Sequence, residues 1–200
     1  FKDHVVLESA QVRTRQGQAF KVFTPYKNQW TRTWQALEGE VPEYKPDLRK
    51  LAPAPPVWKA QDIWKKIALA PSPPTLPGGE RAALARLRDF SARIEAYHLK
   101  RDLPAEDGTS LLSANLRHGN LSIRDMLRLA HSSTRPGHAS WLNELIWRDF
   151  YQMVLDQNPQ VVHQSYKPEF DRVQWRGRPE HLEAWKEGRT GVPIIDAAMR

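Results

Sequence analysis

Residues 141–151 restrict the fold of this chain more than any other stretch. They read Trp-Leu-Asn-Glu-Leu-Ile-Trp-Arg-Asp-Phe-Tyr, without the Gly or Pro that would break a helix. At roughly 100° per residue, an α-helix would sort this stretch and its continuation into two arcs. The first arc is apolar and consists of Leu142, Ile146, Phe150 and Met153. The second arc consists of Trp141, Glu144, Trp147, Arg148 and Tyr151.

The second arc has two interpretations. Flat aromatic surface beside one carboxylate and one guanidinium suits a polar, planar ligand, whereas a purely solvated face would carry Lys and Glu. A buried helix with a satisfied pair between Glu144 and Arg148 would show the same residues. The pattern alone leaves these two interpretations about equal.

Proline divides the chain. Residues 42–77 hold nine of the sixteen prolines, which fix φ and remove backbone donors. We therefore expect an extended connector there. Before it, short strands are predicted at residues 5–7 and 20–23, and a helix at 24–37 begins with Thr24 as N-cap and Pro25 at the first position.

Helices dominate the predictions after the connector. Apolar residues at spacings of three and four predict one amphipathic helix over residues 80–99. Thr109 or Ser110 is expected to cap a short helix ending at Gly119, and Ser122 to cap the next helix with Asp125 completing a capping box. That helix should point four residues inward: Ile123, Met126, Leu127 and Ala130. Further helices are expected from Pro179 and from Pro193.

Composition excludes several classes of site. The chain of 200 residues has no Cys, which excludes disulfides and thiolate chemistry. Its seven His form no His-x-x-x-His pair, so no metal site is expected. No apolar run approaches the roughly 20 residues of a membrane span. The chain begins with Phe1 and ends inside an expected helix, so we expect an internal piece of a longer protein.

Charge and tryptophan content favour a nucleic acid. The net charge of +7 suits a polyanion, although a basic surface also serves solubility. Eight Trp allow base stacking. Five of them are expected in the core: Trp30, Trp34, Trp58, Trp64 and Trp185.

Two groups of residues point to specific chemistry. Gly-Thr-Ser-Leu-Leu-Ser at 108–113 places hydroxyls and free N–H groups before a helix, which favours a phosphate or pyrophosphate. A capped helix without a ligand is the commoner alternative, and Tyr97 with Arg101 could serve the same anion. Glu144 and Trp147 suit a nucleobase rotated out of a duplex. No Gly-x-Ser-x-Gly elbow supports a hydrolase.

These motifs resemble those of one family. Four segments carry the resemblance: 22–27, 102–119, 141–151 and 185–200. In this order they resemble the DNA photolyase and cryptochrome family, and the pairing of Glu144 with Trp147 is most similar to class I cyclobutane pyrimidine dimer photolyases. Leu111 stands where relatives often carry a basic residue, which could weaken a phosphate contact.

The resemblance implies a mainly α fold and a domain order. Residues 1–40 would be the C-terminal edge of an α/β antenna domain, 41–78 an interdomain linker, and 79–200 the first part of a helical FAD-binding, catalytic domain. The implied activity is that of a deoxyribodipyrimidine photo-lyase, with the isolated piece inactive. Reduced FAD would donate an electron under light to a flipped-out dimer, and the electron would return after ring opening. A cryptochrome-like blue-light photoreceptor without repair, and a helical nucleic-acid-binding domain without a cofactor, are the alternatives.

The resemblance also implies which residues form the site. The FAD contacts would be Tyr97, Thr109, Ser110, Leu111, Leu112, Ser113, Trp141 and Arg148. The DNA contacts would be Arg101, Glu144, Trp147, Arg148 and Tyr151. Glu144 and Trp147 would act in catalysis, and no metal is expected.

Partners and location follow from the same resemblance. The expected partner is double- or single-stranded DNA containing pyrimidine dimers, bound by a monomer. A second chromophore of folate or deazaflavin type would sit in an antenna domain outside this sequence. A cytoplasmic, nucleoid-associated location and the absence of a membrane partner are expected.

Overall fold

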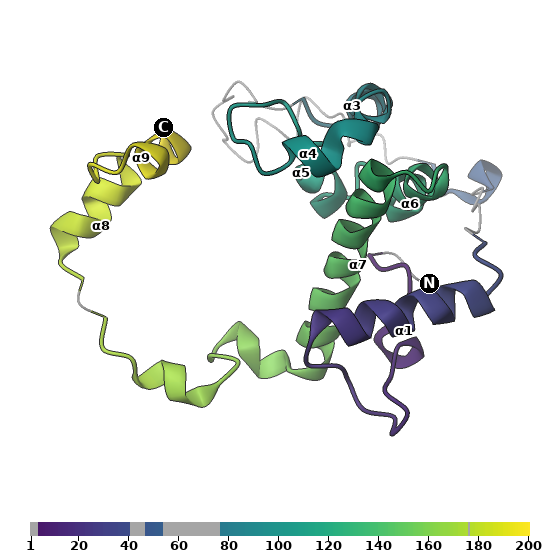
Figure 1. Ribbon diagram of the computed structural model, residues 1–200, viewed down its shortest axis with the longest axis horizontal. Helices are drawn as coiled ribbons and strands as arrows, with labels where there is room; N and C mark the ends of the chain where they lie inside the picture. The colour runs from purple at the N-terminus through teal and green to yellow at the C-terminus, as the bar shows by residue number, and fades with distance from the viewer. Residues whose placement is uncertain (1–3, 41–46, 54–76, 176) are drawn as a thin grey trace. The chain divides into compact units, whose positions relative to one another are not determined.

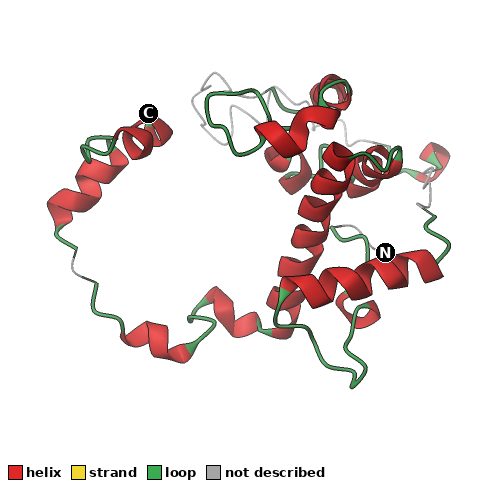
Figure 2. Cartoon of the chain, in the orientation of Figure 1, coloured by secondary structure: helices red, strands yellow, loops and turns green. Residues whose placement is uncertain are grey.

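The computed structural model describes residues 4–40, 47–53, 77–175 and 177–200, which divide into two compact units. Unit 1 covers Phe1–Gln157 and unit 2 covers Asn158–Arg200. Every regular element in the described ranges is helical, and no strand occurs among them (Figure 2). The prediction of a mainly α fold is therefore confirmed.

Helix α7 (Pro136–Gln157) is the element around which unit 1 is built (Figure 1). Helices α1 (Phe23–Ala36), α4 (Tyr97–Lys100) and α6 (Ile123–His131) pack against it, as do the short 3₁₀ turns η1 (Ser9–Gln11) and η3 (Ile94–Ala96). Residues 141–151 therefore lie in the middle of the longest described helix.

The burial of α7 extends beyond the predicted apolar arc. Ile146, Phe150 and Met153 are buried as expected, while Leu142 is only half-buried. Trp141, assigned to the ligand-facing arc, is 3% exposed, and Asp149 is 1% exposed. The helix is buried over a wider arc because α1, α4 and α6 each pack against it.

Helix α1 begins at Phe23, two residues before Pro25, and its N-cap is Val22, so the predicted cap at Thr24 is wrong. Differences of one or two residues are ordinary at helix ends. Trp30 and Trp34 are buried and stacked with ring centroids 5.7 Å apart, so their prediction as core residues is confirmed. Trp185 is 47% exposed, so its prediction was wrong for this structure. Trp58 and Trp64 lie outside the described residues.

The predicted strands at residues 5–7 and 20–23 are wrong. Residues 5–7 form a loop, and Phe23 already belongs to α1. A strand needs a neighbour for its N–H groups, but the N–H groups of Val6 and Leu7 donate to the carboxylate of Asp149 instead. A side chain on α7 thus replaces the missing strand partner.

The predicted helix over residues 80–99 is interrupted. It is divided into α3 (Glu80–Ser91), η3 and α4. The interruption lies where α7 crosses, because a Cβ atom on Gly137 would be only 2.0 Å from the carbonyl oxygen of Ile94. The tertiary contact therefore coincides with the break that the periodicity did not predict.

Helix α6 follows its sequence prediction closely. The Ser122 hydroxyl accepts the N–H of Arg124 at 3.2 Å, and the four predicted inward residues are all buried. The expected capping box is not formed, because the Asp125 carboxylate accepts a hydrogen bond from Arg128 at 2.5 Å. Charge pairing on the helix surface thus replaces the second half of the motif.

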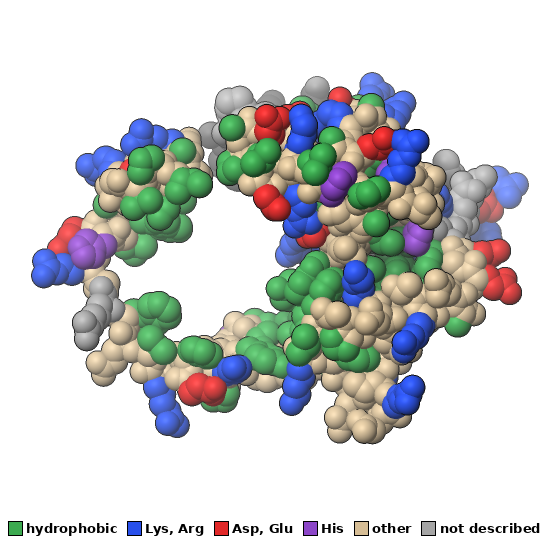
Figure 3. Space-filling model, in the orientation of Figure 1, with side chains coloured by type: hydrophobic (Ala, Val, Ile, Leu, Met, Phe, Trp, Pro, Cys, Tyr) green, Lys and Arg blue, Asp and Glu red, His purple; other side chains and the backbone are tan. Residues whose placement is uncertain are grey.

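Unit 2 contains η4 (Pro159–Val162), η5 (Pro168–Arg172), α8 (Pro179–Lys186) and α9 (Pro193–Met199). The predicted starts at Pro179 and Pro193 are confirmed. Apolar side chains gather on the surface of α8 and α9 (Figure 3), among them Leu182, Trp185 and Ile194. No helix in the described ranges has both the length and the apolar character of a bilayer span.

The predicted division into three regions stays a prediction. Most of the Pro-rich connector lies outside the described residues; within its described parts the short turn η2 (Leu48–Lys50) occurs. The segment before it, which includes α1, packs on α7 rather than standing apart from unit 1.

Candidate functional site

One face of α7 carries four of the predicted site residues. Glu144, Trp147, Arg148 and Tyr151 follow spacings of three and four, which align side chains along a helix. The first three are half-buried and Tyr151 is 62% exposed. The second arc predicted from the helical wheel therefore reaches solvent over this part of its length.

An ion pair joins this face to α4. The guanidinium of Arg101, which caps the end of α4, donates to the Glu144 carboxylate at 2.5 Å and lies 3.4 Å from the Asp102 carboxylate. The hydrogen bond to Glu144 raises the pKa of Arg101, so the guanidinium stays charged. The two side chains retain 30% and 36% exposure, so both can still meet a ligand.

Tyr97 lies beneath this ion pair. Its ring faces the Arg101 guanidinium at 5.3 Å from the ring centroid, a cation–π distance. Burial raises the pKa of the Tyr97 phenol, so the hydroxyl remains protonated and can donate. Tyr97 also lines a cavity of about 180 Å³ together with Lys100 and Gly108, which brings it next to the predicted phosphate segment.

The segment 108–113 is anchored at Gly108. A Cβ atom there would lie 2.4 Å from the carbonyl oxygen of Lys100, so the backbone approaches the end of α4 as closely as only Gly allows. Leu111 adopts the left-handed region at φ 51°, and Leu112 is fully buried. The loop is therefore tightly constrained at both ends.

Helix α5 (Ser113–Arg117) starts later than predicted. Its N-cap is Leu112, so the expected capping by Thr109 or Ser110 is wrong. The burial of Leu112 fixes the helix start, and the two hydroxyls stay in the loop before it. Within the described ranges, the hydroxyls of Thr109, Ser110 and Ser113 have no hydrogen-bond partner, and neither do the N–H groups of residues 109–113.

Trp147 lies against three other aromatic rings. Phe23 of α1 stacks on it with centroids 3.6 Å apart and planes 6° apart. Tyr151 is nearly parallel to it at 5.5 Å, and Phe150 meets it edge-on at 5.6 Å. The ring that was predicted to stack on a base is thus held by the protein itself.

Arg148 has spare donor capacity. Its Nη2 donates to Nδ1 of His4 at 3.5 Å. Its Nε is buried and has no hydrogen-bond partner within the described part of the chain. A buried guanidinium nitrogen without a partner is costly, on the order of 1–3 kcal/mol, so this N–H is a donor that a ligand could satisfy.

Trp141 is the predicted residue that the structure places furthest from solvent on this helix face. Its indole packs against Phe90 of α3 with centroids 5.0 Å apart. Its role in cofactor binding stays a prediction. The contacts described above bring together Tyr97, Arg101, Glu144 and the segment that begins at Gly108.

Sequence reasoning missed Asp149 and Phe23. The Asp149 carboxylate accepts hydrogen bonds from Trp30 Nε1 at 2.9 Å, Leu7 N at 3.1 Å and Val6 N at 3.2 Å. Burial raises its pKa to about 6 despite these bonds. The signal was present, because an acid flanked on its own helix face by Ile146 and Met153 requires buried donors.

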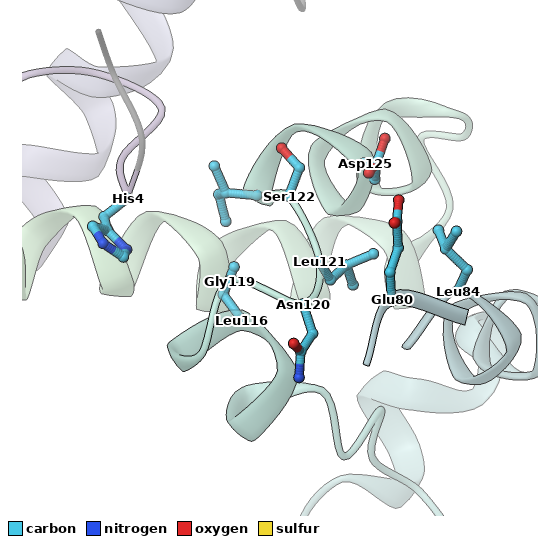
Figure 4. A pocket seen from close by; sticks show the side chains of 10 residues that line it. His4, Glu80, Leu84, Leu116, Gly119, Asn120, Leu121, Ser122 and Asp125 are labelled. Atoms are coloured by element: carbon cyan, nitrogen blue, oxygen red, sulfur yellow. The ribbon is translucent and has the colours of Figure 1, made fainter. Parts of the chain in front are cut away.

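A larger cavity lies elsewhere in unit 1. Its volume is about 380 Å³, and it is bordered by the start of α3, the connection from α5 to α6 and His4 (Figure 4). Glu80, Asn120 and Asp125 line it, but none of the predicted site residues does. The candidate site is therefore the α7 face and not this cavity.

Known proteins with related sequences and structures point to one family. Residues 141–200 match the family model described as the FAD binding domain of DNA photolyase. All of the chain aligns with 43% of the deoxyribodipyrimidine photo-lyase of Escherichia coli at 39% identity. The homologous protein of Neurospora crassa is 33% identical, with 99% of this chain and 36% of that protein aligned.

A solved structure agrees with these sequence relatives. The class III photolyase of Agrobacterium tumefaciens has a TM-score of 0.79 and 30% identity, covering 100% of this chain and 43% of that protein. The chain thus spans less than half the length of these relatives. Because this whole chain aligns with part of these photolyases in sequence and in structure, and residues 141–200 match their FAD-binding domain, the chain belongs to the DNA photolyase family.

Proposed function

We propose that the protein containing this chain repairs cyclobutane pyrimidine dimers in DNA, driven by light. The observation that carries the proposal is the partly exposed face of α7. There the Glu144 carboxylate, which is paired with Arg101, lies one turn before Trp147, which is stacked on Phe23. A carboxylate accepts the N–H groups of a base, and an indole stacks on it. The net charge of +7 supports the approach of DNA.

The residues present fit FAD, the cofactor of this domain family. Unpaired hydroxyls and N–H groups at 109–113 would hold its pyrophosphate, with the Tyr97 hydroxyl nearby. The unpartnered Nε of Arg148 would donate to the flavin. When bound and reduced, FAD supplies the light-driven electron transfer.

The chain's own residues bind and orient the dimer in this proposal. Glu144 accepts hydrogen bonds from the bases, and the Arg101 guanidinium balances its charge while meeting a DNA phosphate. Trp147 stacks against the lesion and Tyr151 borders it.

Replacing Glu144 with Ala is expected to lower the yield of dimer repair about tenfold, because a charge-assisted hydrogen bond to the bases is lost. Flavin content should change little. The measurement uses the full-length protein, its flavin absorbance, and loss of dimers from DNA in the dark and under blue light. Glu95→Ala is the matched control, because Glu95 is an exposed acid paired with Arg135.

The same experiment separates the alternatives. Equal loss of flavin and of repair in Glu144→Ala would mean that Glu144 is structural. A flavin-containing wild-type protein that leaves dimers intact under blue light would be a photoreceptor of the cryptochrome type. A protein without flavin would contradict both functions.

Replacing Arg101 with Gln is expected to weaken binding to dimer-containing DNA several-fold at moderate salt. It should also make the slope of log affinity against log salt concentration shallower, by the amount expected for the loss of about one phosphate contact. Arg128→Gln is the control, because Arg128 is also paired with an acid but lies on α6. Titrations at several salt concentrations check this, and an unchanged salt slope for Arg101→Gln would remove Arg101 from the DNA surface.

A further inference from the structure

We propose that Phe23 is a positioning residue for lesion recognition. It closes one face of the Trp147 ring, so that a pyrimidine dimer can reach this ring only over the part that Phe23 leaves uncovered. This inference rests on the proposed function and adds to it a residue from a different segment of the chain, the first turn of α1.

The ring geometry shows that one face of Trp147 is filled. Centroids 3.6 Å apart with planes 6° apart leave no room for another ring between Phe23 and Trp147. Tyr151 is 5.5 Å away and tilted by 22°, so it covers the indole less completely. Trp147 itself is only half-buried, so part of the indole that Phe23 does not cover still reaches solvent.

Phe23 is not a freely moving side chain, because α1 is fixed along α7 by buried contacts. Tyr26, about one turn after Phe23, packs edge-on against Phe150 with centroids 5.2 Å apart. Trp30, about two turns after Phe23, donates its indole N–H to Asp149 at 2.9 Å. Tyr26, Trp30 and Asp149 are each at most 1% exposed.

The consequence concerns discrimination between damaged and ordinary bases. An indole with two open faces stacks on any base, because every base has a π-face. An indole that is held on one side offers a single surface in a fixed orientation, and this lowers the entropy lost when a ligand of matching shape binds. Phe23 should therefore favour the dimer over undamaged DNA without touching either.

The test compares Phe23→Leu with Phe20→Leu in the full-length protein. Leu preserves apolar packing but removes the flat ring. Phe20 is a matched control, because it is half-buried just before α1 and meets Tyr26 edge-on at 6.0 Å. Phe23→Tyr should restore the wild-type behaviour because it keeps the ring.

Three quantities are measured for each variant: affinity for dimer-containing and undamaged oligonucleotides, repair at saturating substrate, and flavin content. We expect Phe23→Leu to lower the ratio of the two affinities about fivefold, the size of a lost aromatic pair. Repair at saturation and flavin content should stay within twofold of the wild type. Phe20→Leu and Phe23→Tyr should keep the wild-type ratio.

Failure of this inference and failure of the proposed function give different results. A wild-type protein that repairs dimers, with an unchanged affinity ratio in Phe23→Leu, would overturn the role of Phe23 alone. Equal effects of Phe20→Leu and Phe23→Leu would also overturn it, because packing in general would then be responsible. A wild-type protein that repairs no dimers would overturn the proposed function.

Discussion

Replacing Asp149 with Ala is expected to lower the free energy of unfolding by about 3 kcal/mol at pH 7. The change leaves three buried donors without an acceptor: the N–H groups of Val6 and Leu7 and the indole N–H of Trp30. Each unpaired donor costs about 1–3 kcal/mol. The variant also no longer has to bury a carboxylate, and burial of this carboxylate is unfavourable because it raises the pKa of Asp149 from 3.8 to about 6. This gain offsets about half of the total cost of the three unpaired donors.

The size of this effect should depend on pH in a defined direction. The folded protein holds the Asp149 proton more tightly than the unfolded chain, since the folded pKa is the higher one. Protonation of Asp149 therefore contributes to the free energy of unfolding. This contribution is complete below about pH 4 and is lost as pH rises through about 6. The loss caused by Asp149→Ala should therefore be about 1 kcal/mol larger at pH 5 than at pH 7.

Chemical denaturation at both pH values checks this prediction. Asp156→Ala is the control, because Asp156 is an exposed acid on the same helix that is bonded to Ser9 and Gln157. It should change stability by less than about 1 kcal/mol. A loss from Asp149→Ala that stays the same or shrinks at pH 5 would mean that Asp149 does not carry a raised pKa.

Replacing Gly137 with Ala is expected to destabilise unit 1 by about 3 kcal/mol, although Ala is the better helix former by about 1 kcal/mol. The new Cβ atom would lie 2.0 Å from the carbonyl oxygen of Ile94 and 2.6 Å from that of Glu95. Both atoms belong to the backbone, so α7 or η3 has to move, and such overpacking typically costs 1–3 kcal/mol or more.

Gly78→Ala is the control for this prediction. A Cβ atom on Gly78 meets nothing within 4 Å among the described residues, so stability should stay within about 0.5 kcal/mol. Thermal unfolding of both variants provides the comparison. A Gly137→Ala protein as stable as the wild type would show that α7 and η3 are further apart than described.

The effect of Gly137→Ala should extend to the candidate site. Gly137 holds α7 against η3, and α4 follows η3 directly with Tyr97 and Arg101. A shift of η3 therefore changes the 2.5 Å contact between Arg101 and Glu144. Weaker binding of dimer-containing DNA should accompany the lost stability, because positioning errors near 1 Å are costly in such sites.

Local signals predicted three of the helix starts correctly. Ser122, Pro179 and Pro193 each act within one turn of their own position, through a hydroxyl acceptor or a fixed φ. The inward face of α6 followed in the same way, because a single side of that helix is buried. These features need no information about distant residues.

Predictions that depended on distant residues were less successful. The predicted strand at 5–7 does not occur because Asp149 takes the N–H groups of Val6 and Leu7. The predicted strand at 20–23 does not occur either, and Phe23 begins α1. The helix over 80–99 is broken at the crossing with α7. Trp185 is half-exposed on α8, contrary to the expectation that it is a core residue.

The sequence alone determined that residues 141–151 form a helix, that Glu144, Trp147, Arg148 and Tyr151 share a face, and which family motifs the chain carries. Helical periodicity and motif order are properties of neighbouring residues. Only the tertiary structure decided that Trp141 faces the core and that Phe23 covers Trp147. It also decided that Asp149 binds two segments more than one hundred residues away. The physical reason is that burial and hydrogen-bond satisfaction depend on which helices pack together, and that packing is set by the whole chain.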